Sequence, residues 1–346
     1  MKAMLLTGIK QIELRDIPMP EIKSPSDVLL KITAVGVCGS DIHYYKSGKI
    51  GSQVVKYPFI VGHECAGLVE KIGASVKRVA PGDRVAIEPA MSCGQCDQCL
   101  SGRPHTCRKL RFLGCPGQAE GCLTEYLVMP QECCYPVGQG MSAEQAALSE
   151  PLAIGYYAAK RALPLKGTHV AILGCGPIGL SVMVCARAMG AAQIFVTDLI
   201  KERLNIALAH GADWGGNPEN EDIVEKISGQ KPSLLDAVFE CCGEQSALDQ
   251  AIELLKPGGK LMLVGIPKTD RISVVIDKAR RKEIFIQNIR RQCECLHPTL
   301  SLMEKGKLKA DFMITHRFNF SETGKAFDLV AGYSDGVVKA MVNFSK

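Results

Sequence analysis

The first 150 residues show short runs in which apolar and polar side chains alternate. Residues 28–35 form the clearest run, with a period of two and many β-branched side chains, and residues 12–15 alternate in the same way. A glycine-bracketed turn is expected at residues 36–43. Two more strands are expected between residues 62 and 85, joined by a turn at 81–83. The pattern predicts an antiparallel, barrel-like β domain.

The hydrophobic pattern changes after Glu150. Residues 151–162 place apolar side chains at helical spacing, so we expect a helix to begin at Pro151. Short apolar strands are then predicted, separated by helical segments, at 168–173, 193–197, 234–240, 260–264 and 283–289. Alternating strands and helices are typical of a parallel, doubly wound sheet. We therefore expect an α/β domain at 153–287, with 1–152 and 288–346 forming the β-rich domain.

The composition is that of a globular protein of about two domains. Of 346 residues, 47% are apolar and 22% are charged, and the net charge of +5 is spread along the chain. Nothing therefore favours nucleic-acid binding, and no apolar run is long enough to span a membrane. The N-terminus does not resemble a secretory signal. Sixteen cysteines without an export signal indicate a reducing environment, which we expect to be the cytoplasm.

Four of these cysteines have the spacing of a metal site. They follow the pattern C-x2-C-x2-C-x7-C at Cys93, Cys96, Cys99 and Cys107, in a segment expected to be a loop. Four thiolates can close a tetrahedral structural zinc site that leaves no position for substrate. An iron–sulfur cluster would need a shorter final gap followed by proline. Unliganded thiols are the remaining alternative.

A glycine-rich turn follows the strand at 168–173 and opens a helix. Its G-x-G-x-x-G pattern is Gly174-Cys175-Gly176-Pro177-Ile178-Gly179, and Asp198 ends the next strand, 19 residues after Gly179. Gly174 is expected to permit the tight turn, Gly176 to let a pyrophosphate approach, and Gly179 to let helix and strand pack closely. Asp198 is expected to bind the ribose of NAD and to repel the phosphate of NADP. A turn whose glycines serve packing alone is the alternative.

Histidine and glutamate are adjacent at positions 63 and 64, in a segment bracketed by glycines. Adjacent side chains in a strand point to opposite faces, so a loop or bulge must intervene if both face one point. Gly62 and Gly67 are expected to provide that freedom. A surface pair that enters an ordinary strand is the alternative.

Together these motifs resemble the zinc-containing medium-chain alcohol and polyol dehydrogenases. Residues 62–76 fit that family's pattern G-H-E-x2-G-x5-G-x2-V, and the other motifs occur in the family's order, with Cys38-Gly39-Ser40-Asp41 before them and Glu150-Pro151 before the glycine turn. The sequence is most similar to the sorbitol (L-iditol) dehydrogenase branch, notably at 38–44, 87–89, 196–199 and 315–318. The resemblance covers essentially the whole chain. It implies a GroES-like barrel with a zinc-binding lobe, a Rossmann domain, and NAD-linked oxidation of a secondary hydroxyl.

The resemblance also implies a catalytic Zn²⁺ bound by Cys38, His63 and a glutamate, either Glu64 or Glu150. One thiolate, one imidazole and one carboxylate leave a coordination position open, as catalytic zinc requires. Asp41 is expected to accept a hydrogen bond from His63 and so to fix its tautomer.

Proton transfer and cofactor binding involve three further candidates. By resemblance, Ser40 accepts a hydrogen bond from the substrate hydroxyl and His43 completes a relay to solvent. Arg203, five residues after Asp198, is a candidate cofactor contact.

The substrate is less well defined by the sequence. By resemblance to sorbitol dehydrogenase, Tyr44, Phe112, Glu150 and Arg290 would face a polyol. Cys115 and Arg291 depart from that pattern, since the animal enzymes have a threonine and a tyrosine there. The loss of a hydroxyl and the gain of a cation suggest the hypothesis that a sugar acid such as a hexonate is preferred to a neutral polyol.

Other functions remain open. A threonine dehydrogenase of the same family is one, a zinc-independent reductase another, and a non-catalytic nucleotide-binding or structural protein a third. The complete set of candidate ligands favours a zinc enzyme. The resemblance also implies a homodimer or homotetramer, joined through an edge of the cofactor-binding sheet.

Overall fold

The computed structural model describes residues 1–344 and divides the chain into two compact units. Unit 1 comprises Met1–Glu150, Leu296–Glu304 and the segment from Met313 onward, and unit 2 comprises Pro151–Cys295 and Lys305–Phe312. The boundary lies within helix α3, Ala143–Ala162. Compared with the expected domains, unit 2 extends to Cys295 and also contains the short segment 305–312. No helix in the described part of the chain is long and apolar enough to cross a membrane.

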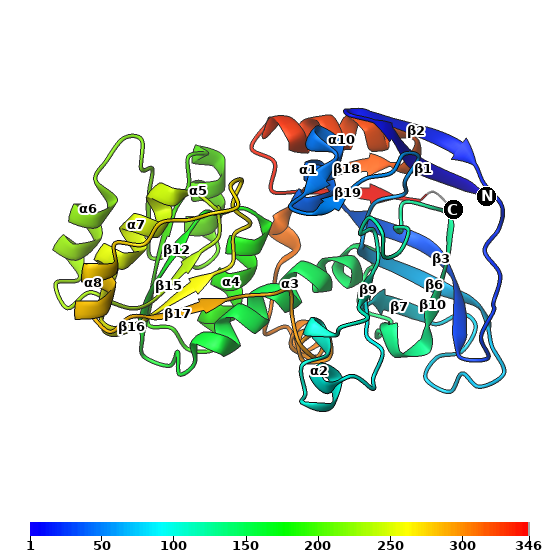
Figure 1. Ribbon diagram of the computed structural model, residues 1–346, viewed down its shortest axis with the longest axis horizontal. Helices are drawn as coiled ribbons and strands as arrows, with labels where there is room; N and C mark the ends of the chain where they lie inside the picture. Colours follow the sequence, from blue (N-terminus) through cyan, green and yellow to red (C-terminus); the bar gives the residue numbers. More distant parts are fainter. Residues whose placement is uncertain (345–346) are drawn as a thin grey trace. The chain divides into compact units, whose positions relative to one another are not determined.

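Unit 1 is built on a sheet in which β3, β6, β7 and β10 run side by side (Figure 1). In the described part of this unit, seven strands pair in the order β11-β7-β6-β3-β19-β18, with β10 also paired to β3. Its pairs are antiparallel, except for β18 with β19. The strands are β3 (Asp27–Gly36), β6 (Glu64–Ile72), β7 (Arg84–Ile87), β10 (Tyr126–Pro130), β11 (Cys134–Pro136), β18 (Ile314–Asn319) and β19 (Lys339–Asn343).

Within residues 1–344, three two-stranded antiparallel sheets and several helices complete unit 1. The sheets are β1 (Lys2–Gly8) with β2 (Gln11–Asp16), β4 (Lys49–Ile50) with β5 (Gln53–Val54), and β8 (Ala90–Met91) with β9 (Arg111–Phe112). The helices are α1 (Gly39–Ser47), α2 (Asp97–Leu100), α9 (Leu296–Glu304) and α10 (Thr323–Gly332). Leu30, Ile32 and Val69 are among the apolar side chains buried in its core.

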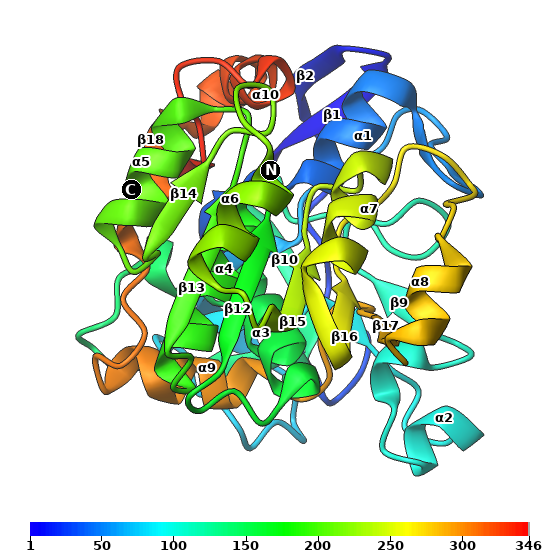
Figure 2. The ribbon, with the colours of Figure 1, turned by 90° about the vertical axis from the view of Figure 1, so that its left-hand side faces the viewer.

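Unit 2 is a parallel, doubly wound sheet, as the sequence predicts. Its strands follow the order β14-β13-β12-β15-β16-β17, and each pair is parallel. Figure 2 shows β13, β12, β15 and β16 side by side, and Figure 1 shows α4 and α7 on opposite faces of the sheet. Strands β12 and β13 are almost wholly buried, because helices cover both faces.

Four of the five strands predicted for unit 2 lie within two residues of the observed bounds, but β16 begins at Leu255 rather than at residue 260, and β14 was not predicted. The strands are β12 (His169–Leu173), β13 (Gln193–Thr197), β14 (Trp214–Gly216), β15 (Leu235–Glu240), β16 (Leu255–Leu263) and β17 (Phe285–Asn288). The helices are α4 (Pro177–Ala188), α5 (Lys201–Ala209), α6 (Ile223–Gln230), α7 (Gln245–Leu254) and α8 (Ile276–Arg281).

Three local expectations are corrected. Residues 36–43, expected as a turn, contain the start of α1. Helix α3 begins at Ala143 rather than at Pro151, because buried side chains such as Leu148 extend it toward the N-terminus, and Glu150 therefore lies inside the helix. Gly67 is not in the left-handed region; a Cβ there would lie 2.8 Å from the carbonyl oxygen of Lys31, so this glycine instead lets β6 approach β3.

Candidate metal and cofactor sites

Helix α1 begins with a group of polar side chains. Cys38 is its N-cap residue, and the Cys38 N–H donates a hydrogen bond to Asp41 Oδ2 at 3.0 Å. The Ser40 hydroxyl donates to Cys38 Sγ at 3.4 Å. His43 follows Ser40 by three residues, so the two side chains lie on the same side of the helix. The start of α1 thus brings together a thiol, a hydroxyl and a carboxylate, with an imidazole one turn further on.

His63 and Glu64 lie at the start of β6. Gly62 has a φ of +96°, which favours glycine, so the chain turns immediately before His63. Asp41 Oδ1 accepts a hydrogen bond from the Gly62 N–H at 3.1 Å and lies 3.5 Å from His63 Nδ1. As a result, ligand atoms of Cys38, His63 and Glu64 lie within 4.8 Å of one another.

This donor set fits a zinc ion. Catalytic zinc is usually held by three protein ligands drawn from thiolate, imidazole and carboxylate. Burial alone would lower the pKa of His63, but the negative charges of Cys38 and Asp41 outweigh it and raise that pKa well above 6.5. The buried site therefore has a negative potential that favours a cation.

Lys339, which belongs to none of the sequence motifs, forms an ion pair with Glu64. It is the first residue of β19, and its Nζ lies 2.6 Å from Glu64 Oε2 and 2.8 Å from Oε1. The same ammonium donates to the carbonyl oxygen of Val37 at 3.0 Å. The side chains of Lys339 and Glu64 are only 1% and 2% exposed. The one signal in the sequence is a lysine inside the apolar run 337–342.

Gly36 makes room for the Glu64 carboxylate. The two residues face each other in the pairing of β3 with β6. A Cβ added to Gly36 would overlap Glu64 Oε2. This requirement arises from strand register, so a motif search along the chain does not detect it.

Two expected substrate contacts lie in unit 1. The ring of Phe112 is 5.3 Å from that of His63, centroid to centroid, so it packs on the candidate ligand. Tyr44 is buried on α1, where its hydroxyl donates to Gln53 Oε1 at 3.1 Å and lies 3.9 Å from Cys115 Sγ. The Tyr44 hydroxyl therefore already has partners within the protein.

Glu150 is buried, with 4% of its surface exposed, and lies within α3. Among residues 1–344, the compact donor group consists of Cys38, His63 and Glu64, and Glu150 is not part of it. Its negative charge nevertheless acts on Lys339. The structure thus brings one of the two candidate glutamates into the donor group and the other into its electrostatic surroundings.

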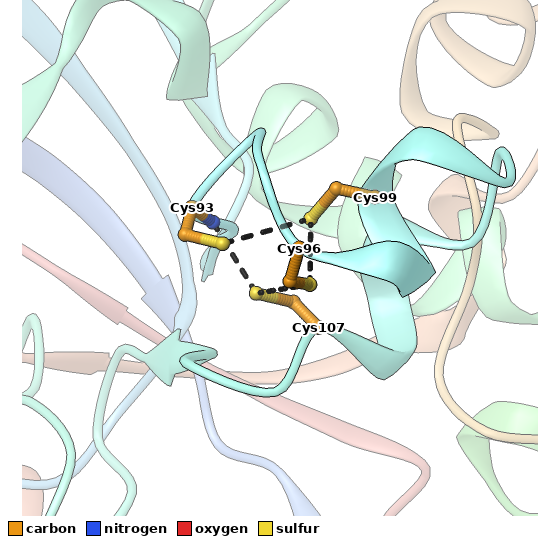
Figure 3. A group of neighbouring side chains, drawn as sticks. All are labelled: Cys93, Cys96, Cys99 and Cys107. Atoms are coloured by element: carbon orange, nitrogen blue, oxygen red, sulfur yellow. Dashed lines mark hydrogen bonds between the residues drawn. The ribbon is translucent and has the colours of Figure 1, made fainter.

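The four cysteines of the C-x2-C-x2-C-x7-C segment converge (Figure 3). Their sulfurs are 3.6 Å apart for Cys96–Cys99, 3.8 Å for Cys96–Cys107 and 4.0 Å for Cys93–Cys99. A zinc ion with Zn–S bonds of 2.3 Å requires sulfur separations of about 3.8 Å in a tetrahedron. The cluster therefore fits a structural zinc. The segment is not the simple loop expected, because it contains the short helix α2. A hydrogen bond from the backbone N–H of Cys99 helps to lower the pKa of Cys96 to about 6.

The glycine turn of unit 2 lies between β12 and α4. Gly174 has a φ of +103°, and a Cβ on Gly179 would overlap the Gly174 carbonyl oxygen. Gly176 caps α4, with Pro177 and Ile178 as the first residues of the helix, and the nearest atom to a Cβ at Gly176 is Arg203 Nη1 at 3.9 Å. The turn thus leaves backbone N–H groups at a helix N-terminus, which is where a pyrophosphate binds in such folds.

Asp198, at the end of β13, is hydrogen-bonded to the backbone of this turn. Its Oδ2 accepts from the Cys175 N–H at 2.7 Å and its Oδ1 from the Ile200 N–H at 2.8 Å. Arg203 on α5 is 7% exposed. A carboxylate and a guanidinium therefore both flank the turn.

Arg290 and Arg291 follow β17 in unit 2. Arg290 is exposed, whereas Arg291 is partly buried and has a φ of +53°, in the left-handed region. Their relation to the residues of unit 1 remains a prediction.

Comparison with known proteins assigns the family. Residues 24–139 match the family described as "Alcohol dehydrogenase GroES-like domain", and residues 177–305 match the family described as "Zinc-binding dehydrogenase". Sorbitol dehydrogenase of Bacillus subtilis is 35% identical over 343 residues, which cover 99% of this chain and 97% of that protein. L-idonate 5-dehydrogenase of Vitis vinifera is 36% identical over 345 residues, covering 98% of this chain and 93% of that protein.

A solved structure supports the same assignment. The crystal structure of L-idonate 5-dehydrogenase from Escherichia coli superposes with a TM-score of 0.92 at 27% identity, covering 99% of this chain and 98% of that one. The fold, the four-cysteine cluster and these relatives agree. The chain belongs to the zinc-containing medium-chain alcohol and polyol dehydrogenase family.

Proposed function

We propose that this protein oxidises a secondary hydroxyl of a polyol of the sorbitol, xylitol or L-iditol type to a ketone, with NAD as the cofactor. The observation that carries the proposal is the convergence of Cys38, His63 and Glu64. Zinc bound by Cys38, His63 and either Glu64 or Glu150 would supply a Lewis acid that favours loss of the hydroxyl proton, and NAD would accept the hydride.

Two residues of α1 are proposed to transfer the proton of the substrate hydroxyl. Because the Ser40 hydroxyl donates its own hydrogen to Cys38 Sγ, its lone pairs remain available to accept a hydrogen bond from the substrate hydroxyl. His43 lies on the same side of the helix and is partly exposed, so it would pass the proton toward solvent.

The choice of NAD is supported by Asp198. Its carboxylate lies beside the glycine turn through its bond to the Cys175 N–H. A negative charge in this place favours a ribose hydroxyl and repels a phosphate.

A sugar acid is the second candidate substrate. Two observations favour it: the adjacent arginines Arg290 and Arg291, and the 36% identity to an L-idonate 5-dehydrogenase. A carboxylate substrate would gain a charge-assisted hydrogen bond from either guanidinium.

A homo-oligomer is proposed through β17, which is one of the two edge strands of the parallel sheet. Phe285 and Ile286 on this strand are 63% and 42% exposed. An exposed apolar edge strand readily pairs with another chain. A cytoplasmic location is also proposed, because none of the sixteen cysteines, all within residues 1–344, forms a disulfide.

The decisive experiment measures NADH formation with sorbitol, xylitol, L-iditol, a hexonate and threonine, before and after complete removal of metal. We expect oxidation of at least one polyol or hexonate that is lost with the metal and restored by Zn²⁺. Activity that survives full demetallation would refute the proposal. Turnover of threonine alone would move the protein to another branch of the family. The Arg291→Ala variant separates the two candidates, because it should impair only a carboxylate substrate.

A further inference from the structure

Lys339 connects strand β6, which carries Glu64, to the segment between β3 and α1, which carries Cys38. Its ammonium has three N–H donors, and three oxygens receive them: two of Glu64 and the carbonyl of Val37, the residue before Cys38. The hydrogen bonds of Lys339 are therefore all made within the protein. They fix Glu64 relative to the backbone that carries Cys38.

The charges around Lys339 show why a cation is needed there. The Cys38 thiolate, Asp41, Glu64 and Glu150 would place four negative charges around a divalent metal ion, two more than the ion can balance. Lys339 supplies one of the missing positive charges. The geometry is that of a charged ammonium, because Nζ of Lys339 is surrounded by three oxygen acceptors at hydrogen-bond distance.

A carboxylate whose two oxygens both accept hydrogen bonds from an ammonium binds a metal ion less strongly, because part of its negative charge is already neutralised. The Glu64 oxygens lie within 4.8 Å of the other donor atoms, yet both already accept charge-assisted hydrogen bonds. Gly36 opposite Glu64 provides the space in which this pair is seated.

We propose that Lys339 is a positioning residue that holds Glu64 beside the metal site and prevents it from becoming a permanent ligand. A coordination position then stays available to the substrate hydroxyl, and Glu64 remains near enough to fill it when substrate leaves. The inference rests on the proposed function only in so far as a metal ion binds at Cys38 and His63.

The test uses the visible absorption spectrum of the protein with Co²⁺ at this site. Difference spectra against the Cys38→Ser variant remove the contribution of the four-cysteine cluster. Glu64→Gln is compared in the wild-type background and in Lys339→Met. Lys339→Arg retains the charge, and Lys325→Met, which breaks an exposed ion pair with Glu322, is the control.

If Lys339 restrains Glu64, Glu64→Gln leaves the wild-type Co²⁺ spectrum nearly unchanged. Lys339→Met should shift the bands, and adding Glu64→Gln should reverse the shift. A chelator should remove Co²⁺ at least about 10-fold more slowly from Lys339→Met than from the double variant, since an extra ligand strengthens metal binding. Lys339→Arg and Lys325→Met should match the wild type.

The inference is overturned if Glu64→Gln changes the wild-type spectrum as strongly as it changes that of Lys339→Met. Should Lys339→Met not fold, the single variant Glu64→Gln still decides, because a shifted spectrum shows a permanent ligand. These readouts need no substrate. A protein that oxidises none of the proposed substrates but shows the expected spectra would refute the proposed function and leave this inference standing.

Discussion

The carboxylate of Asp41 lies 3.5 Å from Nδ1 of His63, and both side chains are buried. The same carboxylate accepts hydrogen bonds from the N–H groups of Cys38 and Gly62. Asp41 thus links the start of α1 to the turn that carries His63. A carboxylate in this position fixes the tautomer of a metal-binding histidine and increases its basicity.

Asp41→Asn should weaken metal binding without unfolding the protein. The amide retains an oxygen that can accept one of the backbone hydrogen bonds, but it lacks the charge that orients His63. We expect the zinc affinity of the catalytic site to fall by about 10- to 100-fold, the usual effect of losing such a partner. Competition with a chelating indicator measures it. Asp83→Asn, in an exposed turn where Asp83 accepts from the Ala80 N–H, is the control and should leave the affinity unchanged. Equal affinities for all three proteins would contradict the prediction.

Gly36→Ala should displace Glu64, because the added Cβ overlaps the Glu64 carboxylate. Misplacement of a catalytic group by about 1 Å can reduce the rate by roughly 10²-fold, and we expect a loss of that order in kcat/KM. Gly39→Ala is a matched control three residues away, since a Cβ there meets no atom within 4 Å. Steady-state kinetics on purified variants make the comparison. Equal activities of the two alanine variants would show that Glu64 can be moved without consequence.

Local motifs in the sequence identify the candidate metal ligands but not the residues that position them. Cys38, His63 and Glu64 could be selected because each lies in a short pattern of glycines and polar residues, and the structure brings their ligand atoms together. Their roles in catalysis remain predictions. Lys339 and Gly36 could not be selected, because their importance arises from the pairing of β3 with β6 and β19, which a single sequence does not reveal.

In the fold, too, elements with a clear local pattern were predicted, whereas an element whose local residues favour another structure was missed. Strands β12 and β13 were predicted within one residue, because each is a short apolar run between helical segments. Helix α1 was missed because Gly39 and Ser40 favour turns. The capping role of Asp41, three residues after Cys38, was the signal that could have revealed it.

Cys96→Ser should remove one zinc ion per chain and destabilise unit 1. Structural zinc sites contribute directly to folding free energy, and three remaining thiolates bind zinc less tightly than four. We expect the melting temperature to fall by roughly 5 °C, the shift that about 2 kcal/mol produces in a domain of this size. Metal analysis and calorimetry provide the measurements. Cys242→Ser alters an exposed thiol outside the cluster and should retain the full metal content. Unchanged zinc content in Cys96→Ser would refute the assignment.

Phe285→Asp should disrupt the proposed oligomer. A charge on the exposed edge strand β17 opposes pairing with a second copy of the strand, because the carboxylate would have to be buried there. Light scattering after size-exclusion chromatography should show a multiple of the chain mass for the wild type and a single chain for the variant. Leu100→Asp, at another exposed apolar position, should leave the mass of the wild type unchanged. A monomeric wild type would exclude the interface.

Asp198→Asn should shift the cofactor preference toward NADP. Its carboxylate stands beside the glycine turn, where its charge would repel a 2′-phosphate, and Arg203 nearby would attract that phosphate once the charge is removed. The asparagine oxygen can still accept from the Cys175 N–H, so the turn is largely retained. We expect the ratio of kcat/KM for NAD to that for NADP to fall at least about 10-fold, since a difference of 1.4 kcal/mol suffices. Asp213→Asn, which breaks the ion pair with Arg187, serves as the control and should leave the ratio unchanged. A wild type that prefers NADP, or a ratio unaffected by Asp198→Asn, would show that this carboxylate does not select the cofactor.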